Sequence, residues 1–340
     1  MIDISPILEG NRLELARLLT QIENDTEAGR ATLNALFPYT GRAHLIGVTG
    51  APGTGKSSLV NQLALAYRKA ENPRRIAVVA VDPSSPFTGG AVLGDRIRMS
   101  ELSGDPGVFI RSMASRGSLG GLARATAGLV QAFDAAGYEI ILIETVGAGQ
   151  AEVDIARLAH TTLVVEAPGL GDEIQAIKAG ILEIADILVV NKADRPGAEN
   201  TERALRGMLQ LAHPVQRVFR HHGRLERVSP HLTPETQKPD TPLWIPPIQR
   251  TVASEGTGVP ELVRAITKHQ DYLIKTGDLA RRERARLQNE LELRIQETLV
   301  NRWRATMPNG QYDDALEKLV KREITPEEAA LALISNGDQS

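Results

Sequence analysis

The 340-residue sequence contains no cysteine, which excludes disulfide bonds and thiolate metal sites. Aromatic residues make up only 4% of the chain, whereas hydrophobic residues make up 42%, so aliphatic side chains must fill the core. The net charge of −3 gives no general attraction to nucleic acid or to an anionic membrane. No apolar stretch reaches 18 residues, so we expect no transmembrane helix and no membrane partner.

The cellular compartment is predicted from the lack of a secretory signal and the lack of cysteine. The opening residues, MIDISPILEGNRLELARLL, lack a basic segment followed by an apolar run, so we expect no secretory signal. A chain without cysteine suits a reducing compartment. We therefore expect a cytoplasmic protein.

From residue 43 onward, short apolar runs alternate with helical patterns. The runs are Leu45–Val48, Ile76–Val81, Val108–Ile110, Ile140–Ile143, Leu163–Val165 and Ile187–Val190, with a more polar candidate at Ile248–Val252. Nearly continuous apolar runs are typical of strands that helices cover on both faces. The alternation predicts an α/β fold with a doubly wound, mostly parallel sheet.

The chain divides into three predicted parts. Residues 1–42 have leucines and isoleucines at helical spacing and form an N-terminal helical extension, and residues 43–266 form the nucleotide-binding domain. Residues 267–340 form a C-terminal helical region, in which Thr325-Pro326-Glu327-Glu328 predicts the start of a last helix. Within the domain, residues 213–247 are rich in Pro, His and Arg. We expect them to form a surface segment outside the strand–helix alternation, with a short strand at Val215–Phe219.

A phosphate-binding loop follows the first apolar run. Residues 50–57 read G-x-x-x-x-G-K-S between a strand and a helix, which is the context that this motif requires. Backbone N–H groups of such a loop surround the phosphates, Lys56 neutralises β- and γ-phosphate charge, and Ser57 offers a hydroxyl to Mg²⁺. The predicted nucleotide contacts in this segment are Gly50, Ala51, Pro52, Gly53, Thr54, Gly55, Lys56, Ser57 and Ser58.

A guanine-reading motif lies about 135 residues further on. Asn191-Lys192-Ala193-Asp194 has the N-K-x-D pattern at a strand end. Asp194 would accept hydrogen bonds from both N1–H and the exocyclic amino group of guanine, whereas Asn191 and Lys192 would brace the loop and the ring. Val252-Ala253-Ser254 would close over the edge of the base.

Three acidic residues stand at strand ends or in the loops that follow them. We expect Asp82 and Asp95 near the metal together with Ser57, and Glu144 to act through water. Gly147 would supply a backbone N–H to the γ-phosphate, so that Lys56, Glu144 and Gly147 form the predicted catalytic set.

These motifs, in this order, resemble one family. They look like those of the methylmalonyl-CoA mutase-associated GTPases, the MeaB/ArgK group of P-loop metallochaperone-type GTPases. The matching stretches are GAPGTGKS, VDPSSPFTGGAVLGDRIRM, FIRSMASRGSLGGLA, ETVGAGQAE, APGLGDEIQAIKAGILEIAD and NKAD. The resemblance runs from about residue 43 to residue 200 and continues more loosely through the C-terminal helices. The sequence departs from the family at 213–245, which is longer and richer in histidine than expected.

The resemblance implies a homodimeric GTPase that binds GTP or GDP with Mg²⁺ and dimerises through its C-terminal helices. Its client would be an adenosylcobalamin-dependent acyl-CoA mutase, whose cofactor loading it would gate and which it would protect against inactivation. The resemblance also marks a loop that responds to the partner mutase, with Asp172, Glu173, Gln175 and Lys178. Independently, the stripe Leu287, Leu291, Ile295, Leu299 and Trp303 needs an apolar partner, either a second chain or the nucleotide-binding domain.

Three other functions stay open on the sequence. A nickel-insertion GTPase shares this broad fold, although the chain has no cysteine and His213, His221, His222 and His231 lie in a Pro-rich segment. A kinase for amino-acid transport proteins, the older description of the family, would need a phosphoacceptor site that no motif indicates. A pure interaction module with an inactive nucleotide site would not need the acidic residues Asp82, Asp95 and Glu144.

Overall fold

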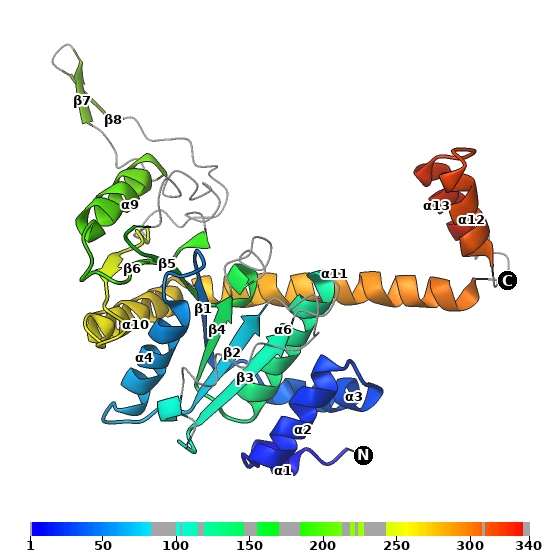
Figure 1. Cartoon of the computed structure of the whole chain (residues 1–340), viewed down its shortest axis with the longest axis horizontal. Helices are drawn as coiled ribbons and strands as arrows, with labels where there is room; N and C mark the ends of the chain where they lie inside the picture. The colour runs from blue at the N-terminus through cyan, green and yellow to red at the C-terminus, as the bar shows by residue number, and fades with distance from the viewer. Residues whose placement is uncertain are drawn as a thin grey trace. The chain divides into compact units, whose positions relative to one another are not determined.

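Seven parallel strands form the central sheet in a computed structural model of the chain (Figure 1). Their order across the sheet is β3-β2-β4-β1-β5-β6-β9. The strands are β1 His44–Thr49, β2 Ile76–Asp82, β3 Val108–Ala114, β4 Ile140–Thr145, β5 Thr161–Glu166, β6 Ile187–Val190 and β9 Ile248–Arg250. Each predicted apolar run is a strand, which confirms the predicted parallel α/β fold.

The structure describes residues 2–82, 100–102, 104–114, 119–145, 155–169, 184–212, 218–221, 224–227, 243–307 and 310–335. The chain divides into two compact units, Met1–Glu283 and Arg284–Ser340. The division into functional parts at residues 42 and 266 remains a prediction. None of the helices in the described ranges is long and apolar enough to cross a membrane.

Helices cover both faces of the sheet, as the apolar strands require. On one face, α4 (Lys56–Arg68) and α10 (Val259–Thr276) bury their leucines and isoleucines against every second strand residue, such as Ile46 and Val48. On the other face, α6 (Leu119–Ala135) packs on the intervening residues, such as Ala77 and Ile141. A third cluster joins α9 (Ala198–Ala212) to β5 and β6.

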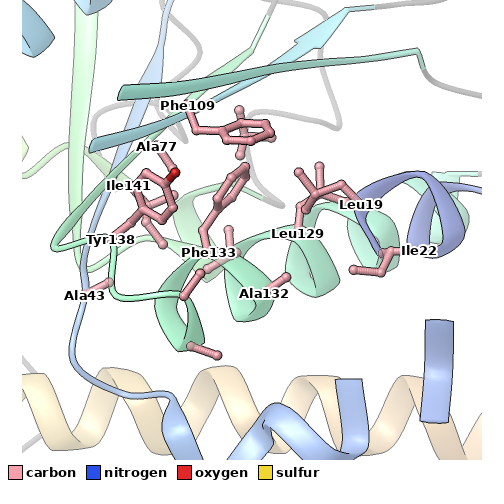
Figure 2. Close-up of a cluster of buried hydrophobic side chains, with 14 of the residues drawn as sticks. Leu19, Ile22, Ala43, Ala77, Phe109, Leu129, Ala132, Phe133, Tyr138 and Ile141 are labelled. Carbon is pink, nitrogen blue, oxygen red and sulfur yellow. The ribbon is translucent and has the colours of Figure 1, made fainter. Parts of the chain in front are cut away.

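The few aromatic residues of the core are concentrated under α6. Phe109, Phe133 and Tyr138 pack together, with ring centroids 5.3 Å apart for the two contacts of Phe133 (Figure 2). Aliphatic side chains surround this trio, as the composition predicted.

The N-terminal segment is helical, as predicted, and its apolar side is part of the core. It forms α1 (Ser5–Leu8), α2 (Arg12–Glu23), α3 (Glu27–Leu36) and the 3-10 helix η1 (Phe37–Tyr39). Leu19 and Ile22 of α2 lie in the same buried cluster as Leu129 of α6 (Figure 2). An ion pair between Arg111 of β3 and Glu23 adds a polar contact at the edge of this cluster.

The C-terminal helices are α11 (Asp278–Thr306), α12 (Gln311–Val320) and α13 (Pro326–Ser335). The predicted start of α13 is confirmed: Thr325 N–H donates to Glu328 Oε2 at 2.8 Å, and Glu328 N–H donates to Thr325 Oγ1 at 3.2 Å. Trp303 of α11 donates its indole N–H to the carbonyl of Leu333 at 3.0 Å, which ties α11 to α13 within the second unit.

The polar segment after α9 differs from the prediction. The structure has an antiparallel hairpin, β7 (Val218–His221) and β8 (Arg224–Arg227), where the sequence predicted one strand at 215–219. The second strand, RLER, carries three charged residues, so no apolar run marked it. The last predicted strand also ends earlier, at Arg250, and Val252 makes an isolated bridge to Thr257.

Candidate nucleotide site

The phosphate-binding loop joins β1 to α4, and its glycines adopt conformations that other residues avoid. Gly50, Gly53 and Gly55 have φ angles of 138°, 80° and 92°. A Cβ on Gly50 would lie 2.1 Å from the carbonyl oxygen of Val165 in β5. The loop therefore turns tightly against the neighbouring strand, which leaves its N–H groups available to an anion.

Lys56 is the first residue of α4, and only 5% of it is exposed. Its Nζ donates to the carbonyls of Gly50 at 2.7 Å and Ala51 at 2.9 Å. The ammonium group is thus held over the loop that would carry the phosphates. Thr54, which is buried, closes the loop from within by donating from Oγ1 to the carbonyl of Ala51 at 2.9 Å.

Ser57 and Glu144 meet at the carboxyl ends of two adjacent strands. Strand β4 pairs with β1, and Glu144 lies opposite Val48 in the register. Ser57 Oγ donates to Glu144 Oε1 at 2.5 Å. A hydroxyl and a carboxylate at this edge are oxygen ligands of the kind that Mg²⁺ prefers. The sequence predicted that Glu144 acts through water, and the structure places it in direct contact with the serine.

Asn191 is the link between the phosphate-binding loop and the predicted base-reading segment. Its Nδ2 donates to the carbonyl of Thr54 at 2.8 Å. Its Oδ1 accepts from Thr251 Oγ1 and from Ala253 N–H, both at 3.1 Å. With 1% of its surface exposed, this side chain is a fixed part of the fold.

Lys192 and Gly55 complete this link. Lys192 has a positive φ of 55° and donates from Nζ to the carbonyl of Gly53 at 2.6 Å. Gly55 passes so close to Asn191 that a Cβ would lie 2.4 Å from Asn191 Nδ2. The N-K-x-D segment therefore binds two consecutive carbonyls of the loop and lies close to the residue that follows them.

The remaining predicted base contacts lie beside this link. Ala193 N–H donates to the carbonyl of Thr251 at 3.0 Å, which joins the segment after β6 to the segment after β9. Val252 and Ala253 are buried, whereas Asp194 and Ser254 are exposed. Pro52 and Ser58 of the phosphate-binding loop are also exposed.

The nucleotide loops therefore share one edge of the sheet, which is where parallel α/β proteins bind their ligands. The sequence as a whole matches a family of GTPases, in agreement with this geometry. Residues 15–308 match the family described as methylmalonyl Co-A mutase-associated GTPase MeaB. The chain belongs to this family. The resemblance found in the sequence is thereby confirmed.

Individual MeaB-family relatives and a solved structure agree. A protein of Pyrococcus abyssi that is named a GTPase is 42% identical over 97% of this chain and 95% of its own length. The methylmalonic aciduria type A homolog, mitochondrial, of Caenorhabditis elegans is 30% identical over 96% of this chain and 80% of its own length. The crystal structure named LAO/AO transport system kinase has 25% identity and a TM-score of 0.68, with full coverage of both chains.

Several predicted residues of the MeaB-family site lie outside the described residues. They are Asp95, Gly147, Asp172, Glu173, Gln175 and Lys178, together with the side chain of Asp82. The backbone of Asp82 ends β2, beside β4 in the sheet. Its position is therefore at the same edge as Glu144.

Thr251 contributes to the site although no sequence motif predicted it. Its side chain is buried and holds Asn191. Its position in the sequence could have indicated a role, because Thr251 directly follows β9 and precedes the predicted Val252-Ala253-Ser254 segment. A lone threonine after a weak polar strand carries no motif of its own, however.

Proposed function

We propose that the site binds GTP and hydrolyses it to GDP and phosphate. The observation that carries the proposal is the position of Asn191, whose amide contacts Thr54 on one side and Thr251 and Ala253 on the other. One buried side chain thus sets the distance between the phosphate-binding loop and the base-reading segment. Asp194, which is exposed at the same edge, would accept the two N–H groups of guanine that adenine cannot offer.

The donor set fits Mg²⁺, because Ser57 Oγ and Glu144 Oε1 are 2.5 Å apart beside the loop. We assign Ser57, Asp82 and Asp95 to the ion. When bound, Mg²⁺ supplies positive charge that neutralises the β- and γ-phosphate oxygens.

The side chains supply positioning and charge for the reaction. A water oxygen attacks the γ-phosphorus, the bond to the β–γ bridging oxygen breaks, and GDP leaves with that oxygen. Glu144 orients the water, Lys56 offsets negative charge on the phosphates, and the N–H of Gly147 binds a γ-phosphate oxygen. Catalysis of this type depends mainly on positioning and electrostatic stabilisation.

We further propose that the GTP cycle serves an adenosylcobalamin-dependent acyl-CoA mutase of the methylmalonyl-CoA mutase type. The protein would gate cofactor loading and protect the mutase, and Asp172, Glu173, Gln175 and Lys178 would respond to it. Membership of the MeaB family supports this client, since the family is described by its association with that mutase. We place the protein in the cytoplasm on its composition without cysteine.

We propose that the protein is a homodimer that associates through α11. Leu291, Ile295 and Leu299 recur at intervals of four residues, and 60%, 48% and 60% of their surfaces are exposed in the single chain. Three large apolar side chains in one row favour an interface with a second copy.

GTP turnover with and without purified mutases tests the proposed function. We expect slow turnover by the protein alone and faster turnover with one of methylmalonyl-, ethylmalonyl- or isobutyryl-CoA mutase loaded with adenosylcobalamin. Asp172→Ala with Lys178→Ala should retain the basal rate and lose the stimulation. Equal turnover of ATP and GTP would contradict the nucleotide assignment, and the absence of stimulation by all three mutases would contradict the client assignment.

A further inference from the structure

A buried polar network lies at the edge of the sheet opposite the nucleotide loops. His44 opens β1, Thr161 opens β5 and Asp186 immediately precedes β6, and these three strands are neighbours in the sheet. His44 and Asp186 are buried, and Thr161 has no exposed surface. The proposed GTP chemistry uses none of these residues.

Hydrogen bonds connect the network from the sheet to α10. His44 Nε2 lies 2.8 Å from Thr161 Oγ1, which lies 2.9 Å from Nδ1 of His269 on α10. His269 Nε2 lies 3.2 Å from Asp186 Oδ1. One proton arrangement satisfies both hydrogen bonds: Thr161 donates to Nδ1 of His269, and His44 donates to Thr161. It leaves the N–H of His269 on Nε2, beside Asp186.

Asp186 is also the anchor for α11. Arg282 donates from its two terminal nitrogens to Oδ1 and Oδ2 of Asp186, both at 2.8 Å, and to the carbonyl of His160 at 3.0 Å. The N–H of Thr162 adds a fourth donor to the carboxylate at 2.8 Å. Burial alone would raise the pKa of Asp186, but the hydrogen bonds from His269 and Arg282 outweigh it and lower the pKa. The carboxylate is therefore charged and fully engaged.

A single residue, Gly277, separates the two helices that meet on Asp186. Helix α10 ends at Thr276 and α11 begins at Asp278, and Gly277 between them has a φ of 76°. A Cβ on Gly277 would meet no atom of the described residues within 4 Å. Glycine has no side chain to restrict a change of backbone conformation at this junction, and His269 before it and Arg282 after it both contact one carboxylate.

Asp186 is buried and 32% of the Arg282 side chain is exposed, and an ion pair with a buried partner gains little stability because desolvation cancels much of its attraction. The two hydrogen bonds from Arg282 to Asp186 instead fix the position of Arg282 on α11 relative to the start of β6. The second compact unit begins at Arg284, two residues beyond Arg282 in the same helix. Arg282 therefore lies close to the end of the first unit, where the next residue, Glu283, places its Oε2 3.4 Å from His160 Nε2.

We propose that Asp186 and Arg282 form a lock across a hinge at Gly277. With the lock closed, the first turns of α11 are fixed against the base of β1, β5 and β6. Opening the lock frees α11 to pivot at Gly277 without unfolding either helix. This inference goes beyond the proposed GTP cycle and does not depend on it.

Spin-label distance measurements test the lock, and the chain suits them because it contains no cysteine. Cysteines introduced at the exposed positions Asn34 on α3 and Ala280 on α11 carry the labels. The labelled protein is diluted into an excess of unlabelled chain, so that only distances within one chain are recorded. We expect a narrow distance distribution for the parent protein and at least a doubling of its width in Asp186→Asn.

Two further variants keep the test decisive. Asp186→Asn with Arg282→Met leaves no buried charge without a partner, so it should fold even if the single variant does not. Arg281→Met is the matched control, because Arg281 is the neighbouring arginine, 64% of its side chain is exposed, and it pairs with Asp278 on its own helix. Broadening in the double variant but not in the control supports the lock. A distribution as narrow as that of the parent protein in the folded double variant overturns it.

Discussion

Gly55 and Asn191 stand so close together that a Cβ on the glycine would lie 2.4 Å from Nδ2 of the asparagine. Gly55→Ala should therefore displace the amide that links the phosphate-binding loop to the base-reading segment. Gly53→Ala is the matched control, since Gly53 has a similar φ of 80° but no described atom within 4 Å of the added carbon.

Both substitutions carry backbone strain of roughly 1–2 kcal/mol. We expect Gly55→Ala to weaken the binding of a fluorescent GTP analogue at least tenfold more than Gly53→Ala does. Titrations of both variants, with melting temperatures measured in parallel, check this. Equal losses would show that strain alone matters and that the Gly55–Asn191 contact does not.

Asp194→Asn should change which base the site accepts. The carboxylate would receive two hydrogen bonds from guanine, and the amide can instead donate to the C2 oxygen of xanthine. We expect affinity for GTP to fall by about 10²-fold or more, because polar groups of the base lose their partners. Competition titrations with GTP and XTP measure the switch, and Asp271→Asn, at an exposed position of α10, serves as the control. An unaltered GTP preference in Asp194→Asn would contradict the role of Asp194.

Glu144→Gln should slow hydrolysis more than it weakens binding. The amide keeps the size of the carboxylate beside Ser57 but loses its negative charge. We expect the single-turnover rate to fall by about 10²-fold, while the GTP dissociation constant changes only a few-fold. Glu139→Gln, just before the other end of β4, is the matched control, because Glu139 pairs with Arg74 away from the loop. A rate equal to that of the unmodified protein would remove Glu144 from the catalytic set.

His44 should make stability depend on pH. Burial, together with the neighbouring His160 and His269, lowers the pKa of His44 to about 3, against an opposing effect of Asp186. The unfolded chain binds this proton below about pH 6.5, and the folded protein does not bind it until about pH 3. The free energy of unfolding therefore falls as the pH falls through this window, by at most about 1.4 kcal/mol per pH unit.

His44→Gln keeps an N–H donor for Thr161 and removes the titration. Urea denaturation between pH 6.5 and 4.5 should show a shallower loss of stability in the variant than in the unmodified protein. Between pH 7.5 and 9, where His44 is neutral in both states, the two curves should run parallel. Identical slopes at low pH would mean that His44 is charged in the folded protein.

Leu291→Asp with Ile295→Asp should give a monomer that still binds GTP. Burial of each of these side chains contributes roughly 1.5–3 kcal/mol, so two charges in the row should abolish association at micromolar concentration. Light scattering and nucleotide titration of the same sample measure both properties. Asn289→Asp with Gln296→Asp adds the same charge on a different face of α11 and should leave the dimer intact. A Leu291/Ile295 variant that remains dimeric would refute the proposed interface.

Sequence patterns predicted the sheet well, because buried parallel strands such as Ile187–Val190 are continuously apolar. The sequence also marked the loops of the site, since phosphate and guanine recognition require fixed residue types at fixed spacing, and the roles of their residues remain predictions. The hairpin at 218–227 was only partly predicted, because its second strand has no apolar run.

The buried polar network around Asp186 could not be predicted. Its members lie far apart in the sequence, from His44 to Arg282, and each strand contributes a single polar residue. Only the order of β1, β5 and β6 in the sheet brings them together, and no local pattern encodes that order.

The packing of the N-terminal helices has a consequence for synthesis on the ribosome. Ile22 on α2 packs against α6, where a Cβ on Gly128 would lie 2.8 Å from Ile22 Cγ2. Gly128 follows Ile22 by 106 residues in the chain. At roughly 5–20 residues per second, the apolar side of α2 waits on the order of 5–20 s before its partner is made. During that interval the apolar side of α2 is a natural target for chaperones that bind exposed apolar helices.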